Sequence, residues 1–288
     1  MTGGKGVFMK RQAVIIILLV LGLVLAPILG SCTLVKTERL KVVTSTSLLT
    51  YIVQQVGGDE VDVVNIVPPA QHPGDFDANP GDIQRLASAS LFLVHGWPGE
   101  TWVPNLVASA NNPNLKLVTI SVEGSWMTPS VQMQATDKVA DALGDVDRKN
   151  NITYQKRAAE YKVAVLAKEA NIMGDLFTAN LSAVNVICAS FQADFVKWTG
   201  MKVVATYGTP ESFKPQLVKE LVDKGRAANV TLIVDNLHSG RDAGKGIAEE
   251  LGCKRIILLN FPGGFDNTET WEKAIDYNIE QILKAVAK

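Results

Sequence analysis

The sequence predicts an α/β protein with two lobes, each a parallel sheet flanked by helices, joined by one long interlobe helix. Three observations lead to this fold class. Strand-like and helix-like segments alternate from residue 40 to residue 121, the order typical of a parallel sheet covered by helices. Residues 150–180 then contain no proline and a single glycine, Gly174, which favours one long helix. The alternation resumes at residue 182 and continues to the end of the chain.

The N-terminal residues have the pattern of an export signal. Basic residues up to Arg11 precede an apolar segment, residues 13–30, and small residues then lead to Cys32. A basic start, an apolar middle and small residues before a cleavage point are typical of a secretory signal peptide. The ending Leu-Gly-Ser-Cys resembles the bacterial lipobox, in which the cysteine carries lipid and becomes the new N-terminus.

We therefore predict a signal peptide with a lipobox at residues 1–32, a lipid anchor at Cys32 and a polar spacer at residues 33–38. An uncleaved membrane anchor is the alternative. Either arrangement places the rest of the chain outside the cytoplasm and attached to a lipid membrane, as a lipoprotein of the cell surface or the periplasm.

Residues 39–149 are predicted to form the N-terminal lobe. Its first helix ends at the Gly57-Gly58 pair, because glycine favours a helix C-terminus. The next helix begins at Asn79, a residue type that caps helices, with Pro80 in the first turn. The predicted strands are 40–46, 61–69, 90–96 and 115–121, and the predicted helices are 47–58, 79–89 and 130–147.

Residues 150–179 are the predicted interlobe helix, and residues 180–288 the predicted C-terminal lobe. About 28 helical residues extend roughly 42 Å, which is longer than one small domain needs. Because this helix would tie the two lobes together, we expect only a small closure when a ligand binds. The predicted strands of the second lobe are 182–189, 201–207, 230–236 and 254–260, and its helices are 191–200, 209–229, 240–253 and 268–288.

Charge and cysteine content limit the partners and the covalent links. The net charge is −1, so nothing favours nucleic acid or an anionic membrane surface as a partner. Besides Cys32 the chain has two cysteines, Cys188 and Cys253, both in apolar surroundings. An oxidising compartment would permit a disulfide between them, and two buried free thiols are the interpretation that we favour.

The predicted strand ends carry the residues of greatest functional interest. In open parallel sheets, ligands bind beyond the carboxyl ends of the strands. All three histidines, His72, His95 and His238, follow predicted strands. Trp126 lies near another strand end, where an aromatic side chain either lines a small-molecule cleft or packs one lobe onto the other. We therefore expect a ligand cleft between the lobes.

The sequence lacks the common motifs of catalysis. It contains no Gly-x-Ser-x-Gly elbow, no His-Glu-x-x-His and no close cysteine pair with zinc spacing. We therefore expect a binding protein and not an enzyme.

Six segments, in this order and spacing, carry a resemblance to a known family. Residues 41–69 resemble its first strand, helix and second strand, residues 150–170 its interlobe helix, and residues 208–236 part of its second lobe. The other segments are 82–102, 126–143 and 247–260. The family is that of the metal-binding solute receptors of ABC importers, the zinc and manganese receptors called cluster A-I or TroA-like. The resemblance covers nearly all of the sequence after the spacer. It implies a receptor that delivers its ligand to a membrane permease, with zinc or manganese as the transported ion and no resident cofactor.

The metal-binding histidines of that family are substituted in this chain. The family has its first histidine in Pro-His-Asp-Tyr, where this sequence has Pro-Gly-Asp-Phe with Gly74 at the matching position. The second histidine of the family lies two residues before a tryptophan, where this sequence has Gly124. Because glycine has no side-chain donor, both substitutions remove a metal ligand and are expected to leave volume in the cleft.

The two remaining ligands of the family map to the predicted C-terminal lobe. The third, a histidine or glutamate, maps near Cys188 to Ser190, where neither residue type occurs. The fourth, an acidic residue after a late strand, maps near Asn260 or Asp235. The resulting candidates for the ligand cleft are Gly74, Gly124, His72, His95, Trp126, Cys188, Asp235, His238 and Asn260.

Three hypotheses for the ligand follow from these substitutions. The first is a metal ion in a relocated site made by His72, His95, His238 and Asp235, with Cys188 as a further donor. The second is a metal chelate or small organic solute in the volume beside Gly74 and Gly124. The third is a non-transport adhesion or accessory protein that kept the fold.

Overall fold

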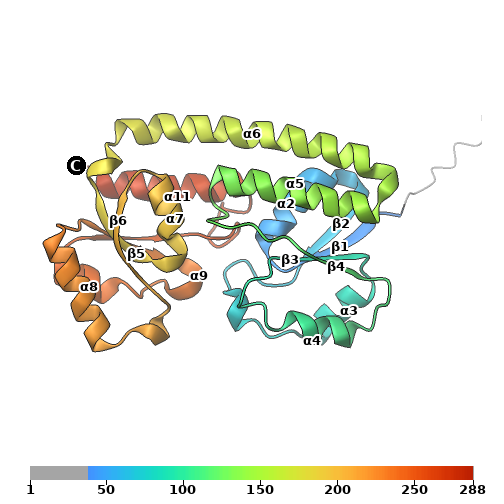
Figure 1. The fold of residues 1–288 in the computed structure, drawn as a ribbon, viewed down its shortest axis with the longest axis horizontal. Coiled ribbons are helices and arrows are strands. Elements are labelled where there is room, and N and C mark those ends of the chain that lie inside the picture. The colour runs from blue at the N-terminus through green and yellow to red at the C-terminus, as the bar shows by residue number, and fades with distance from the viewer. Residues whose placement is uncertain (1–37, 288) are drawn as a thin grey trace, which may run out of the picture. The chain divides into compact units, whose positions relative to one another are not determined.

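Two four-stranded parallel sheets form the framework of the protein, which we describe from a computed structural model covering residues 38–287 (Figure 1). The strand order is β2-β1-β3-β4 in the first sheet and β6-β5-β7-β8 in the second. The predicted α/β fold with two lobes is therefore confirmed. The strands are β1 Leu40–Thr44, β2 Val61–Asn65, β3 Leu91–Val94, β4 Lys116–Thr119, β5 Asn185–Ala189, β6 Lys202–Tyr207, β7 Leu232–Asn236 and β8 Lys254–Leu258.

Helices flank both sheets, and most of them lie where the hydrophobic pattern predicts them. One further helix, α4, lies in a segment for which no helix was predicted, although its buried residues Val103, Leu106 and Ala110 recur at helical spacing. Within the described residues, no helix is long and apolar enough to cross a membrane. The helices are α2 Ser47–Gly57, α3 Pro80–Ala87, α4 Val103–Ala110, α5 Pro129–Val146, α6 Asn151–Thr178, α7 Ala193–Trp198, α8 Pro215–Ala227, α9 Leu237–Gly240, α10 Lys245–Leu251 and α11 Trp271–Val286.

Local capping residues, prolines and turns determine where several helices begin. The side chain of Asn79 accepts hydrogen bonds from the backbone N–H groups of Gly81 and Asp82, and the Asp82 side chain accepts from the Asn79 N–H, which caps α3 as predicted. Helix α8 begins later than expected because Pro215 occupies its first position and holds the preceding residue in an extended conformation. The predicted helix 240–253 is likewise shorter, since the chain forms the separate turn α9 before α10.

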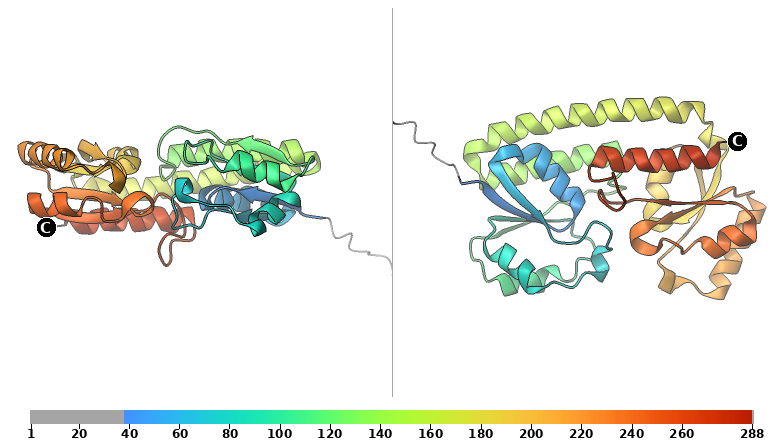
Figure 2. Two further views of the ribbon diagram at one scale, coloured as in Figure 1. Left: turned by 90° about the horizontal axis from the view of Figure 1, so that it is seen from below. Right: turned by 180° about the vertical axis from the view of Figure 1, so that it is seen from behind.

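The long helix α6 connects the two sheets (Figure 1). It packs on α5 and α2, which belong with the first sheet, and on α11, which belongs with the second. Figure 2 shows the same arrangement from behind, with α6 running beside α11. Its buried residues recur at helical spacing along one face: Tyr154, Ala158, Tyr161, Val165, Ile172 and Leu176.

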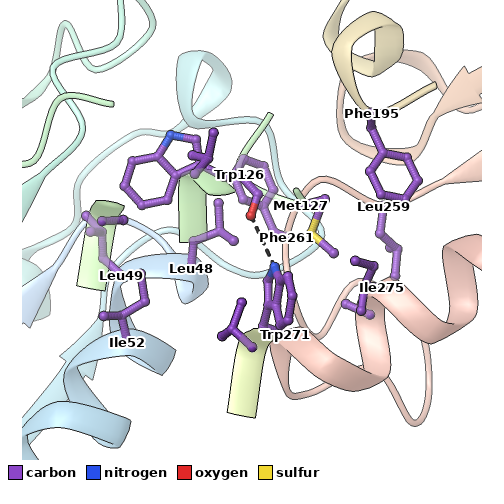
Figure 3. Close-up of a cluster of buried hydrophobic side chains, with 14 of the residues drawn as sticks. Leu48, Leu49, Ile52, Trp126, Met127, Phe195, Leu259, Phe261, Trp271 and Ile275 are labelled. Carbon is purple, nitrogen blue, oxygen red and sulfur yellow. Dashed lines mark hydrogen bonds between the residues drawn. The ribbon is translucent and has the colours of Figure 1, made fainter. Parts of the chain in front are cut away.

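One hydrophobic core cluster runs through both lobes (Figure 3). It joins Leu48 of α2 and Trp126 of the first lobe to Trp271 of α11. The indole N–H of Trp271 donates a hydrogen bond to the backbone carbonyl of Trp126 at 3.2 Å. Because buried aromatic side chains contribute much of the apolar area of a core, this contact links the positions of the two lobes.

Two buried histidines lie near this junction. His238 lies in α9, and its Nε2 donates a hydrogen bond to the backbone carbonyl of Pro69 in the first lobe, at 2.7 Å. His95 follows β3, and its Nε2 lies 2.7 Å from the Thr46 hydroxyl. Burial lowers the pKa of His238 to about 4 and the pKa of His95 well below its ordinary value. Both imidazoles are therefore neutral at pH 7.

The two cysteines of the described chain are free thiols, in agreement with the favoured interpretation. Cys188 is buried on β5, and Cys253 is half-buried. Burial raises the pKa of the Cys188 thiol to about 12, so this side chain behaves as a small apolar residue.

We expect Trp271→Ala to destabilise the protein strongly. The substitution leaves a cavity in the shared core and an unpaired carbonyl, which together cost about 3–5 kcal/mol and lower the melting temperature by roughly 10 °C. Circular dichroism during thermal and urea unfolding measures the effect. Trp198→Ala on the half-buried face of α7 serves as the matched control and should cost less. Equal losses in the two variants would show that Trp271 has no special role in joining the lobes.

We expect acidification from pH 7.5 to pH 5 to destabilise the protein. The unfolded chain takes up protons near pH 6.5 at both histidines, whereas folded His238 resists protonation down to about pH 4. The unfolded state therefore binds more protons, and His238 contributes a loss of about 2 kcal/mol by pH 5, with His95 acting in the same direction. Urea midpoints at the two pH values measure the loss. In His238→Gln the pH-dependent loss should shrink by about 2 kcal/mol, and parallel profiles for both proteins would contradict this assignment.

Candidate functional site

A cavity of about 290 Å³ lies between the carboxyl ends of the two sheets. From the first lobe, Leu48 follows β1 and Trp97 follows β3. From the second lobe, Phe191 follows β5 and Asn260 follows β8. The cleft expected from the strand ends is therefore present, since parallel strands gather their carboxyl ends at one edge of a sheet.

Five of the nine candidate residues line this cavity. They come from four different strand ends, so the fold brings together residues far apart in the sequence. The five are His72, Gly124, Trp126, His238 and Asn260. The other four are Gly74, His95, Cys188 and Asp235, and they lie outside the lining.

The cavity lining lacks acidic and strongly basic side chains. Among the residues that the structure describes, no Asp, Glu, Lys or Arg belongs to the lining. His238 is neutral at pH 7 because burial lowers its pKa. A ligand with a net charge would therefore find no counter-ion on these walls, and burying an unpaired charge is costly.

Aromatic rings form much of the wall. Trp97 is stacked on His95, with ring centroids 3.6 Å apart and planes within 4° of parallel. The indole of Trp126 stands nearly perpendicular to Trp97, at 86° and 6.1 Å. Phe261 lies 5.9 Å from Trp97, and its ring meets His238 edge-on at 4.4 Å. Trp126 fulfils both of the roles considered for it: its side chain lines the cavity and also packs in the core shared by the two lobes.

Four polar atoms of the lining residues are buried and have no hydrogen-bond partner within the described chain. The indole N–H of Trp126 is one unpaired donor. Asn236 caps α9 with its Oδ1, which accepts from the N–H groups of His238 and Ser239, so its Nδ2 is the second unpaired donor. Asn260 Oδ1 is an unpaired acceptor. Leaving such groups unpaired costs about 1–3 kcal/mol each.

The fourth unpaired atom is Nδ1 of His238. Its other ring nitrogen, Nε2, faces the carbonyl of Pro69, which can only accept, so Nε2 carries the hydrogen. The neutral ring therefore has a free lone pair on Nδ1. This unpaired nitrogen can therefore accept a hydrogen bond but cannot donate one.

The two glycines at the positions of the family's histidines have different reasons to be glycine. A Cβ at Gly74 would lie 2.9 Å from Nδ1 of His72, so the space beside it already holds the His72 ring. The expectation of open volume at Gly74 is therefore wrong. Gly124 has φ +100°, a conformation that side-chain-bearing residues rarely adopt, and it does line the cavity.

His72 crosses from one lobe toward the other. Its Nδ1 accepts a hydrogen bond from the backbone N–H of Gly74 at 3.0 Å. Its ring lies 5.7 Å from that of Phe191 in the second lobe. This histidine therefore closes one side of the cavity with its ring, while the nitrogen that faces Gly74 is already occupied.

The structure does not bring the relocated metal set together. Within the described residues, no group of three or more His, Cys, Asp and Glu side chains could hold a metal ion. His95 is engaged with Thr46 beneath Trp97, and Cys188 is buried in the sheet on β5. Asp235 is bound by Arg255, the Tyr207 hydroxyl and the Gly244 N–H within its own lobe.

Several lining residues were not singled out from the sequence. Phe191, Asn236 and Phe261 lie in segments recognised as strand ends, but nothing in the sequence distinguishes the residues that face the cavity. Their directions depend on how the chain turns after each strand. Cys32 lies outside the described residues.

Comparison with known proteins agrees with this architecture. The family described as ZnuA, zinc-uptake complex component A periplasmic, matches residues 42–285. The iron ABC transporter substrate-binding lipoprotein MtsA of Streptococcus pyogenes serotype M1 is 25% identical over 287 residues, covering 88% of this chain and 91% of MtsA. The manganese ABC transporter substrate-binding lipoprotein PsaA of Streptococcus mitis is 23% identical over 289 residues, covering 87% and 90% of the two chains.

Solved structures share the fold at low sequence identity. The nickel complex of the solute-binding protein FpvC of P. aeruginosa superposes with a TM-score of 0.74 at 18% identity, covering 86% of this chain and 97% of FpvC. A zinc-bound deletion mutant of ZnuA gives a TM-score of 0.73 at 19% identity, covering 87% and 99% of the two chains.

The resemblance found in the sequence is therefore confirmed, and the family is one of transporter binding proteins and not of enzymes. With the match extending from residue 42 to residue 285, this chain belongs to the ZnuA family of metal ABC transporter substrate-binding proteins.

Proposed function

We propose that this protein is a lipid-anchored, extracytoplasmic receptor of an ABC importer whose cleft binds a small solute and not a bare metal ion. The family membership supports a receptor that serves a membrane permease. The observation that carries the altered specificity is the lining of the cavity, which is rich in aromatic rings and, among the described residues, has no Asp, Glu, Lys or Arg.

The donor chemistry of the cavity does not fit zinc or manganese. Zinc takes about four nitrogen, sulfur or oxygen ligands at roughly 2.0–2.3 Å, and manganese prefers carboxylates. Among the described residues of the lining, no cysteine or carboxylate is present, and the imidazoles are those of His72 and His238. One nitrogen of each is already hydrogen-bonded to the backbone, at Gly74 and Pro69 respectively.

A ligand in the cavity would contact both lobes and could therefore hold them together. The cavity walls come from both lobes, so a bound solute adds contacts that join them. Ser47 also donates to the carbonyl of Pro262 across the same junction, at 2.8 Å. Because α6 packs on both lobes, we expect the change between open and closed forms to be small.

Metal binding is the direct test of this proposal. We expect no tight uptake of Zn²⁺ or Mn²⁺ in isothermal titration calorimetry, and no rise in melting temperature with either ion, because binding to the folded state alone would raise it. Protein released from membranes without denaturation should instead carry a non-metal mass in native mass spectrometry. The manganese protein PsaA is the positive control for the titrations.

Two results would contradict the proposal that the cleft binds a small solute. A zinc-dependent rise in melting temperature that disappears in both His72→Ala and His238→Ala would show that the cleft holds the ion directly. Protein that carries and binds no small molecule of any class would favour the adhesion or accessory role.

We expect Cys32→Ala to abolish lipid attachment. If Cys32 is the lipidated residue, the wild-type protein sediments with membranes and partitions into detergent, and its mass corresponds to a chain that begins at residue 32. The variant should lose its lipid label when cells are fed radioactive palmitate. Fractionation and mass spectrometry measure both properties, with Cys253→Ala as the matched control. An unprocessed, unlabelled wild-type chain in the membrane would instead indicate an uncleaved anchor.

A further inference from the structure

We propose that the cavity selects an uncharged, planar heterocycle that carries both hydrogen-bond donors and acceptors, the chemistry of a nucleobase or of nicotinamide. This inference rests on the proposed function and names the class of solute. Three independent features of the cavity support it: its lack of charge, its aromatic faces and its unpaired polar atoms.

The lack of charge excludes most charged solutes. Solutes such as amino acids, phosphates or carboxylates would need a counter-ion within the cavity, because burying an unpaired charge is far costlier than burying a neutral polar group. No such side chain belongs to the lining in the part of the chain that the structure describes. Asp235, which precedes the lining residue Asn236, is paired with Arg255 within its own lobe.

The aromatic residues favour a flat ligand. One face of Trp97 is covered by His95 at 3.6 Å, so only its other face is available to a ligand. Trp126 stands at 86° to that plane and Phe261 at 44°, which gives walls of different orientation around one flat surface. Phe191, which is 49% exposed, lies at the rim contributed by the second lobe. A planar ring that stacks on Trp97 would meet the edges of the other rings, and stacking of this kind stabilises the binding of flat ligands.

The unpaired polar atoms favour a ligand with mixed hydrogen-bonding edges. The lining residues hold two donors, Trp126 Nε1 and Asn236 Nδ2, and two acceptors, Asn260 Oδ1 and His238 Nδ1. A carbonyl beside a ring N–H or an amino group can satisfy one of each kind. Sites built from such groups discriminate strongly against analogues that leave them unpaired.

The size of the cavity limits the ligand to one or two fused rings. Its volume of about 290 Å³ is at the lower end of the range for small-molecule pockets. A quaternary ammonium ion would suit the aromatic walls but would leave the four polar atoms unpaired. A purely apolar ring would also suit the aromatic walls, but it too would leave the four polar atoms unpaired. The neutral heterocycle is the solute that accounts for the walls and the polar atoms together.

A panel of solutes tests the inference directly. Calorimetry and thermal shift at pH 7.5 would compare adenine, hypoxanthine, cytosine, uracil and nicotinamide with choline, toluene, glutamate and Zn²⁺. We expect at least one of the five heterocycles to bind with micromolar affinity or better and to raise the melting temperature. Choline, toluene, glutamate and Zn²⁺ should bind at least about 100-fold more weakly, since each lacks a feature that the cavity requires.

Variants then assign the effect to the walls and to the polar atoms. For the heterocycle that binds, Phe191→Ala and Trp97→Leu should weaken affinity at least about fivefold through loss of ring contacts. Asn260→Leu should weaken affinity about tenfold through loss of a hydrogen bond. Trp198→Leu, a tryptophan outside the cavity, is the control and should leave affinity unchanged. Melting curves of each unliganded variant confirm folding. Because the Phe191 side chain is half exposed, Phe191→Ala is the variant least expected to impair folding.

The outcomes separate this inference from the proposed function. Tight binding of choline or glutamate, or a charged solute released from the purified protein, would overturn the neutral-heterocycle assignment and leave the receptor function intact. Tight binding of Zn²⁺ would overturn both. Binding of a heterocycle that is unaffected by Phe191→Ala, Trp97→Leu and Asn260→Leu would place it elsewhere and overturn the assignment of this cavity.

Discussion

The contact between Trp126 and Trp271 is the interaction on which the arrangement of the site depends. The backbone carbonyl of Trp126 accepts the indole N–H of Trp271, and both side chains belong to the core cluster shared by the two lobes. The indole of Trp126 also forms a wall of the cavity and touches the edge of His95. Because protein cores are densely packed, the position of this cavity wall is fixed by the core behind it.

This coupling explains how a cleft with few polar contacts can be well defined. The cavity walls are rigid aromatic rings held from behind: Trp97 by His95, His95 by Thr46, and Phe261 by the edge of His238. The backbone N–H groups of His95, Gly96 and Trp97 all donate to the carboxylate of Glu100, which fixes the loop after β3. Such support holds a ligand surface in place before the ligand arrives, and less ordering is then required on binding.

We infer that the fold of the family and the chemistry of its cleft have separated in this chain. The sheets, the long helix and the cleft at the strand ends are those of metal-binding relatives, and TM-scores of 0.74 and 0.73 measure that similarity. The residues that would coordinate an ion are not gathered in the cleft of the described chain. Fold similarity alone does not determine the ligand, because binding depends on a few side chains at the site. Here those side chains are aromatic rings and neutral amides.

The sequence by itself determined the alternation of strands and helices, the long helix at residues 151–178 and the family. These features follow from local hydrophobic periodicity, capping residues and the order of segments, all of which are properties of the linear sequence. It also located the strand ends where the cavity forms, and it identified five of its lining residues, among them Trp126 and His238.

Only the tertiary structure decided which side chains meet. His95 and Asp235 follow strands as the cavity residues do, yet one is covered by Trp97 and the other is bound by Arg255. The space at Gly74 is filled by His72, a neighbour only two positions away, whose direction depends on the turn between them. Such outcomes depend on the direction of each side chain and on packing between distant segments, and neither property has a signature in local sequence.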